Sequence, residues 1–208
     1  ARYLLFGAVV ARARVLQTVN PQFRARLYTS LAPGDQEMMD FYVHNGFDCD
    51  ETDSLLELRI PFGDGRIPMS CTVALTPLNT FEEQENLLYR LNVNEITFVD
   101  RNYLSMLMRM PHFLPLGLYR NASLIGEVLL AGQGADCELA AIYIEPSNRR
   151  QGMARALLHR SMAIMAAEGV TRVTTRIMTR SLPQQHLAND FGATPLGVNM
   201  IFPGMYLS

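Results

Sequence analysis

The most informative segment of the sequence is residues 144–154, Ile144-Glu145-Pro146-Ser147-Asn148-Arg149-Arg150-Gln151-Gly152-Met153-Ala154. An apolar run that predicts a buried strand ends here, a polar turn follows, and small residues open a predicted helix. The first amides of a helix lack intrahelical partners and carry the positive end of its dipole. Gly152 lets a phosphate approach the backbone, and the two arginines offer charge-assisted hydrogen bonds. The segment therefore predicts a pyrophosphate-binding cradle, against the simpler alternative of an arginine-rich loop that only caps a helix.

Hydrophobic periodicity predicts an alternation of strands and helices on both sides of this cradle. Strands are expected at residues 69–76, 116–120, 123–130, 137–144, 170–178 and 198–202. Helices are expected at residues 79–91, with Asn79 as its cap, and at residues 102–110, 153–167 and 183–191. The resulting order, β-α-α-β-β-β-α-β-α-β, predicts an α/β (α+β) fold with a mixed sheet.

The first third of the chain predicts a related but shorter unit. It is expected to contain helices at residues 3–17 and 35–45, the second capped by Asp35, and strands at 24–30 and 54–60. The turn at residues 62–65 marks the predicted boundary, so the expected domains are 1–64 and 65–208. A shift of 146 residues places Gly46 on Gly192 and Arg26 on Arg172, which indicates an internal repeat.

Composition limits the classes of function. The net charge of −2 and the pI of about 6.1 argue against a nucleic-acid binder. All eighteen basic residues are arginine, so lysine Schiff-base chemistry is excluded. Three widely spaced cysteines give no zinc pattern or disulfide framework, and we expect no metal, no membrane and a cytoplasmic location.

The apolar run of residues 3–11 is too short to cross a bilayer and is expected to be a core helix. The alternative for this run is a signal peptide, which is disfavoured because Arg12 and Arg14 follow where a cleavage site should be. The sequence leaves open whether the natural chain extends upstream of Ala1.

The cradle resembles the Q/R-x-x-G-x-G/A loop of the GNAT superfamily of N-acetyltransferases. Arg149, Gly152 and Ala154 fill its three defining positions, and the resemblance covers about residues 66–208. Residues 41–47 resemble the same family near its C-terminus, but residues 3–8 are apolar where a cradle should stand. The resemblance implies a complete domain with a mostly antiparallel sheet flanked by helices. Before it stands a partial half-domain that extends the sheet or forms a dimer.

The resemblance also implies how acetyl-CoA binds. The amides of Gln151, Gly152, Met153 and Ala154 would hold the pyrophosphate, beside Arg149 and Arg150. The strand from Ile142 to Ile144 would pair through its backbone with the pantetheine arm. Ser181 stands where the family often has a cofactor-contacting asparagine, and a serine can still form a hydrogen bond there.

For catalysis, Glu138 stands where one branch of the family carries its general base. The alternative for Glu138 is a solvated carboxylate at a strand edge. The family's usual acid, a tyrosine, is replaced by Ala188. A thiol has a pKa of about 8.5, so a thiolate can leave without that acid. His186 is a weak alternative acid, and Cys137 a disfavoured nucleophile because no histidine is near it in sequence.

Two functions remain open from the sequence. The first is transfer of an acetyl group from acetyl-CoA to a primary amine, by direct attack in a ternary complex with Glu138 as base. The second is a CoA-binding regulatory or assembly module that lacks efficient chemistry, as Ala188 and Ser181 suggest. The expected partners are acetyl-CoA and an amine acceptor, with a homodimer through the N-terminal half or the sheet edge. Met106, Met108 and Met110 line the acceptor pocket or, more simply, belong to the core.

Overall fold

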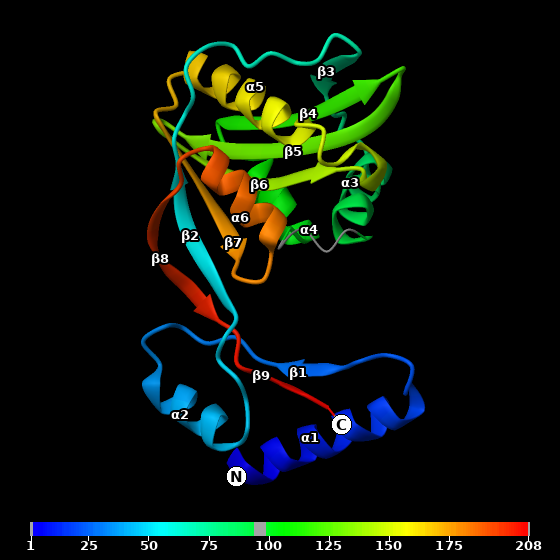
Figure 1. Ribbon diagram of the computed structural model, residues 1–208, viewed down its shortest axis with the longest axis vertical. Helices are drawn as coiled ribbons and strands as arrows, with labels where there is room; N and C mark the ends of the chain where they lie inside the picture. The colour runs from blue at the N-terminus through cyan, green and yellow to red at the C-terminus, as the bar shows by residue number, and fades with distance from the viewer. Residues whose placement is uncertain (1, 94–98, 208) are drawn as a thin grey trace. The chain divides into compact units, whose positions relative to one another are not determined.

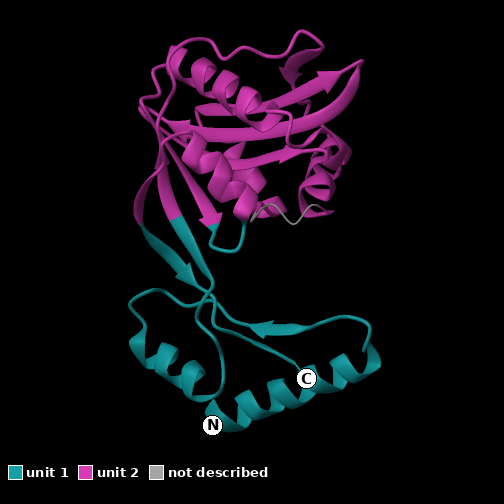
Figure 2. Ribbon diagram, viewed as in Figure 1, with its two compact units in different colours: residues 1–54, 178–181, 197–208 teal, residues 55–177, 182–196 magenta. Residues whose placement is uncertain are grey.

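A computed structural model describes residues 2–93 and 99–207 of the chain. The described residues form two compact units (Figure 2). Unit 1 contains residues 1–54, 178–181 and 197–208, and unit 2 contains residues 55–177 and 182–196. The division falls within three strands: β2 (Thr52–Leu58), β8 (Thr194–Ile201) and, before its last residue, β7 (Arg172–Met178). The units therefore follow packing and not chain order, and the boundary after residue 64 stays a prediction about the sequence repeat.

Unit 2 is built on a mixed sheet flanked by helices, as the sequence predicts (Figure 1). The seven strands follow the order β3-β4-β5-β6-β7-β2-β8. The pairs from β3 to β6 are antiparallel, and β6 and β7 are parallel. The remaining strands of the sheet are β3 (Cys71–Leu75), β4 (His112–Arg120), β5 (Ser123–Gln133), β6 (Asp136–Ile144) and β7 (Arg172–Met178). The helices are α3 (Phe81–Val93), α4 (Arg101–Leu107), the short turn η1 (Pro146–Asn148), α5 (Met153–Ala167) and α6 (Leu182–Asp190).

Two hydrophobic clusters pack on this sheet. One contains the buried residues of α5, including Leu157 and Met162, together with Leu130 of β5. The other contains residues of α3 and α4, including Leu91 and Leu104, with Leu129 of β5. Since successive side chains of a strand point to opposite faces, Leu129 and Leu130 belong to opposite layers. Helices therefore cover both faces of the central strand.

The sequence predicts Asn79 as the cap of α3, but the helix begins with a capping box at Thr80. The Thr80 hydroxyl accepts a hydrogen bond from the Glu83 amide at 3.2 Å, and the Glu83 carboxylate accepts one from the Thr80 amide at 2.9 Å. The cap is therefore Thr80 and not Asn79, because the Thr-x-x-Glu spacing satisfies two amides reciprocally. The tight turn between β4 and β5 uses left-handed backbone at Asn121 and Ala122.

Unit 1 contains α1 (Arg2–Val19), β1 (Arg26–Tyr28), α2 (Gln36–His44) and β9 (Gly204–Tyr206). Asp35 caps α2, as predicted, by accepting a hydrogen bond from the Met38 amide. The prediction that the first apolar run is a core helix is wrong, because α1 has no buried residue. Its main anchor is Phe6, whose ring lies 5.3 Å from that of Phe41 and 5.8 Å from that of Phe47. Leu4 and Leu5 instead remain exposed.

No helix in the described part of the chain is both long and apolar enough to cross a membrane.

The shift of 146 residues relates the bounds of some elements in the two predicted copies. Adding 146 to the bounds of α2, residues 36 and 44, gives 182 and 190, the bounds of α6. The same shift moves the start of β1, residue 26, to residue 172, the start of β7. The strands, however, exchange partners between the copies. Strand β2 of the first copy lies between β7 and β8, and β9 of the second copy pairs with β1.

One buried ion pair joins α3 to the middle of the sheet. The Glu127 side chain on β5 is 1% exposed. Its two oxygens accept hydrogen bonds from Arg90 of α3, at 2.6 and 2.8 Å. This bidentate geometry compensates a carboxylate that would otherwise be buried without a counter-ion.

We predict that Arg90→Ala lowers the free energy of unfolding by about 3 kcal/mol, because it leaves the buried Glu127 carboxylate unpaired. The matched control is Arg101→Ala, which breaks the exposed pair between Arg101 and Glu85 and is expected to cost less than about 1 kcal/mol. Denaturant unfolding of both variants measures the difference. Equal losses would contradict a special role for the buried pair.

Candidate functional site

The central feature of unit 2 is a place where two neighbouring parallel strands stop pairing. Strands β6 and β7 are paired from Asp136 with Arg172 to Leu139 with Thr175, and no further. Beyond that point β6 continues to Ile144, and the two strands diverge (Figure 1). The second half of β6 therefore has an edge without a neighbouring strand, which can accept an extended ligand.

A narrow cavity of about 40 Å³ lies at this divergence. Its walls come from Ala140 and Ile142 of β6, Arg176 of β7 and Ala188 of α6. Ala140 is also the extra residue of a β-bulge, because Leu139 pairs with Leu130 while Ala141 pairs with Leu129. Bulges often occur beside active sites, where they redirect the backbone. Ile142, predicted as a contact for the pantetheine arm, therefore lines the opening.

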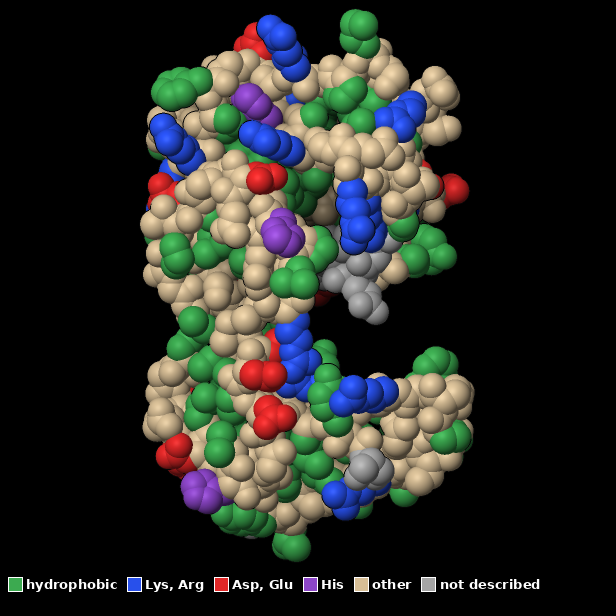
Figure 3. Space-filling model, viewed as in Figure 1, with side chains coloured by type: hydrophobic (Ala, Val, Ile, Leu, Met, Phe, Trp, Pro, Cys, Tyr) green, Lys and Arg blue, Asp and Glu red, His purple; other side chains and the backbone are tan. Residues whose placement is uncertain are grey.

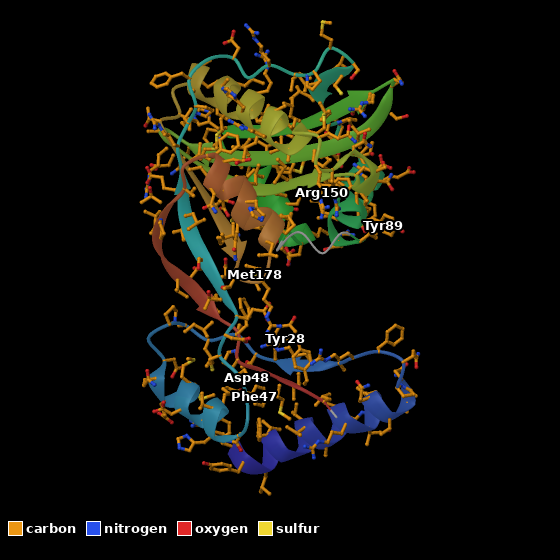
Figure 4. The ribbon with its side chains drawn as sticks, in the orientation of Figure 1. Tyr28, Phe47, Asp48, Tyr89, Arg150 and Met178 are labelled. Carbon is orange, nitrogen blue, oxygen red and sulfur yellow. The ribbon has the colours of Figure 1, made fainter. Side chains whose placement is uncertain are left out.

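The predicted cradle follows at the end of β6. Gly152 caps α5 in a left-handed conformation with φ of 75°, and Arg150 before it has φ of 58°. Figure 4 labels Arg150, whose side chain is exposed in this turn. A methyl group on Gly152 would meet no atom within 4 Å, so the space in front of it is open. Within the described residues, the amides of Gln151 to Ala154 have no acceptor. This arrangement has the properties of an anion site.

A hydrogen-bond network that no local sequence pattern indicates holds the cradle in shape. Arg120 of β4 donates to Asn148 at 2.9 Å and to Gln151 at 3.4 Å. The buried Asn148 side chain donates in turn to the carboxylate of Glu145 at 3.0 Å. Arg149 donates from its Nε to the Ile144 carbonyl at 2.8 Å. That carbonyl is therefore already engaged, which limits the part that Ile144 was predicted to play. Arg120 lies 29 residues before Arg149, so no local motif could indicate it.

Glu138 stands on the paired half of β6 within a second network. Its Oε2 accepts a hydrogen bond from the Tyr103 hydroxyl at 2.7 Å, and its Oε1 accepts one from Arg176 at 3.1 Å. Arg176 also donates to the Tyr103 hydroxyl at 2.9 Å. Tyr103 is positioned by Asp100, the cap of α4, which accepts from the Tyr103 amide. Glu138 is therefore a partly buried, bonded carboxylate, and not the solvated one that was its alternative.

Two neighbours of this network have raised pKa values. Burial raises the pKa of Tyr103 well above its usual value, and its hydrogen bond to Glu138 raises it further. Burial, followed by the nearby charge of Glu138, raises the pKa of the Cys137 thiol to about 12. A thiol with such a pKa is protonated at neutral pH and is a poor nucleophile. Cys137 belongs instead to the buried core.

The other residues named from the sequence fall in several places. Ala188 is buried and lines the cavity, so the residue in place of the usual acid does reach the site. His186 is exposed on α6. Ser181 is in unit 1, whereas the cradle is in unit 2. Of the methionines, Met106 is exposed and Met108 packs against the core. Across residues 2–93 and 99–207, no group of three or more potential ligands could hold a metal ion.

Comparison with known proteins identifies one family. The model of the acetyltransferase (GNAT) family matches residues 80–193, which is 114 of the 208 residues. That match includes the cradle, Glu138 and Ala188. No curated protein matches the sequence.

Solved structures show the same fold at low sequence identity. A GCN5-related N-acetyltransferase from Sphaerobacter thermophilus has a TM-score of 0.60 and 14% identity, over 88% of this chain and 60% of that one. Another from Kribbella flavida has a TM-score of 0.55 and 17% identity, over 86% and 67%. A tandem GNAT protein from the clavulanic acid biosynthesis pathway has a TM-score of 0.56 and 16% identity, over 96% and 69%. The chain thus spans three-fifths of the Sphaerobacter structure. At these low sequence identities, the similarities show that the fold is shared and nothing further.

The network around Glu138 predicts an unusual tyrosine titration. Because burial and the Glu138 carboxylate favour the neutral phenol, Tyr103 is expected to ionise well above the ordinary value of about 10. The stabilisation that comes from the raised pKa of Tyr103 is therefore complete below about pH 10 and is lost as the pH rises further. Tyrosinate absorbance of the native chain minus that of Tyr103→Phe isolates the residue. Glu138→Gln should lower its pKa, and a Tyr103 that titrates with the exposed tyrosines would contradict the network.

Proposed function

The chain belongs to the GNAT family of acetyltransferases, and from this premise we propose that it transfers the acetyl group of acetyl-CoA to a primary amine. The observation that carries the proposal is the continuity of two features of unit 2. The unpaired half of β6 runs directly into the open amides of the cradle. An extended arm with a pyrophosphate at its end fits this path, because a strand edge pairs with the arm and a helix start binds the anion.

The residues of the cradle have separate roles in this proposal. The amides of Gln151 to Ala154 bind the pyrophosphate, and Arg149 and Arg150 flank it. Ile142 offers backbone groups to the pantetheine arm along the open part of β6. Ser181 belongs to unit 1, so its contact with the cofactor remains an expectation from the family resemblance alone. The thioester then lies near Ala140, where the bulged backbone is available to stabilise the oxyanion.

The chemistry is a direct transfer in a ternary complex. The lone pair of a neutral amine attacks the thioester carbonyl, the C–S bond breaks, and CoA leaves as a thiolate. The amine loses its proton to Glu138, directly or through a water molecule. Each Glu138 oxygen already accepts one hydrogen bond, so the proton must reach a remaining lone pair. Ala188 cannot protonate the thiolate, which is stable enough to leave because thiols have a pKa of about 8.5.

A second function is a CoA-binding module that lacks efficient chemistry. The observation in its favour is that Glu138 is bonded to both Tyr103 and Arg176, while Ala188 faces the cavity. A carboxylate held in this way can serve the structure alone. The likeness to a tandem GNAT protein supports a related proposal, that residues 1–64 are a partial GNAT-like half that has lost its own cradle.

The cradle is tested by two glycines at the two ends of α5. Gly152 and Gly169 both have positive φ, and both have open space where a methyl group would stand. Alanine at either position should therefore cost a similar amount of stability, about 1 kcal/mol. Only Gly152→Ala should also weaken the binding of CoA, by about tenfold or more in Kd, because its methyl group stands where the phosphate must approach. Calorimetric titration with CoA distinguishes the two, and equal affinities would count against the cradle.

The transfer is tested by thiol release from acetyl-CoA over a panel of primary amines. We expect Glu138→Gln to lower kcat by about 100-fold or more, as for the loss of a general base. The control is Asp136→Asn, on the same strand, which removes only an exposed pair with Arg172. Unchanged turnover in Glu138→Gln would exclude Glu138 as the base. CoA binding without turnover of any amine by the native chain would favour the module instead.

A further inference from the structure

Unit 2 contains a second cavity, on another face of α5 from the opening between β6 and β7. It has a volume of about 440 Å³. One wall is residues 62–66, the segment that follows β2, and the other is the first turns of α5. The two cavities share no lining residue. The larger cavity does, however, include Gly152, so it adjoins the cradle.

The segment 62–66 is fixed to α5 by specific contacts. The His159 side chain contacts the Phe62 carbonyl at 3.2 Å, and Arg160 donates to the Asp64 carbonyl at 3.1 Å. Because a carbonyl only accepts, the Nε2 of His159 is the donor in the first contact. Gly65 lies so close to the helix that a methyl group on it would stand 2.5 Å from the Arg160 nitrogen. The wall is therefore part of the packed structure and not a loose loop.

The lining of this cavity is basic. Arg66 comes from one wall and Arg155 from the other, and both side chains are exposed. Throughout the described parts of the chain, neither has an ion-pair or hydrogen-bond partner. Asp64 is the one acidic residue of the lining. On the face shown in Figure 3, arginine side chains surround a histidine over α5. Two unpaired guanidinium groups that converge on one cavity are suited to a phosphate.

We propose that this cavity binds the nucleotide end of CoA, with Arg66 and Arg155 holding the phosphate on its ribose. The proposal rests on the proposed function, because it needs a pyrophosphate on the cradle amides. Gly152 borders both places, so a ligand bound at the cradle continues into the cavity without crossing the helix. The ring of Phe62 is 92% exposed at the rim, where it offers a flat apolar surface to the purine.

The first test compares CoA with 3′-dephospho-CoA by calorimetry. The native chain is expected to bind CoA about tenfold more tightly, which is the size of one charge-assisted contact. Arg66→Gln and Arg155→Gln should each remove most of this preference and leave the affinity for 3′-dephospho-CoA nearly unchanged. The control is Arg59→Gln, an exposed arginine outside the cavity lining, which should keep the preference.

The second test moves the wall. Gly65→Ala forces residues 62–66 away from α5, whereas Gly63→Ala, also at positive φ, meets no atom within 4 Å. Only Gly65→Ala should abolish the preference for CoA over 3′-dephospho-CoA. This inference would be overturned if the native chain bound CoA and 3′-dephospho-CoA equally, or if the arginine variants weakened the binding of both ligands equally. Either result would leave the proposed function standing. Failure of the native chain to bind CoA at all would overturn both.

Discussion

The rest of the site depends on the point in the sheet where β6 and β7 stop forming hydrogen bonds with each other. Parallel pairing of β6 with β7 ends at Leu139 and Thr175, although both strands continue. A sheet that stayed closed here would leave no edge for a ligand and no space at Ala140. Two features maintain the opening. The bulge at Ala140 bends β6, and α5 and α6 both contribute side chains to the walls of the gap. The strand separation thus leads directly to the start of α5.

Strands from both predicted copies of the repeat contribute to this arrangement. Strand β2, from the first copy, is the neighbour of β7 on its other side, and β8 lies beyond it. The N-terminal part of the chain therefore contributes a strand to the sheet of the site, and residues 3–8 are apolar where its own predicted cradle would stand. In return, β9 from the second copy pairs with β1.

Much of the fold and the cradle could be predicted from sequence because their signals are local. The periodicity of the elements, the turn at residues 121–122 and the glycine of the cradle all act within a few residues. The supports of the site could not be predicted in this way. Arg120, Tyr103 and Arg176 reach their partners from distant strands and helices, and only the folded sheet brings them together. The first helix was misjudged because apolar content predicts burial only when a partner surface is present, and α1 has Phe6 as its main anchor.

We infer that acetyl-CoA lies along the open edge of β6 with its pyrophosphate at the start of α5. A crystal structure of the chain with saturating CoA tests it most directly. We expect the pyrophosphate to lie within hydrogen-bonding distance of the amides of Gln151 to Ala154, and the pantetheine arm to lie between β6 and β7. CoA bound elsewhere, with no phosphate against these amides, would contradict it.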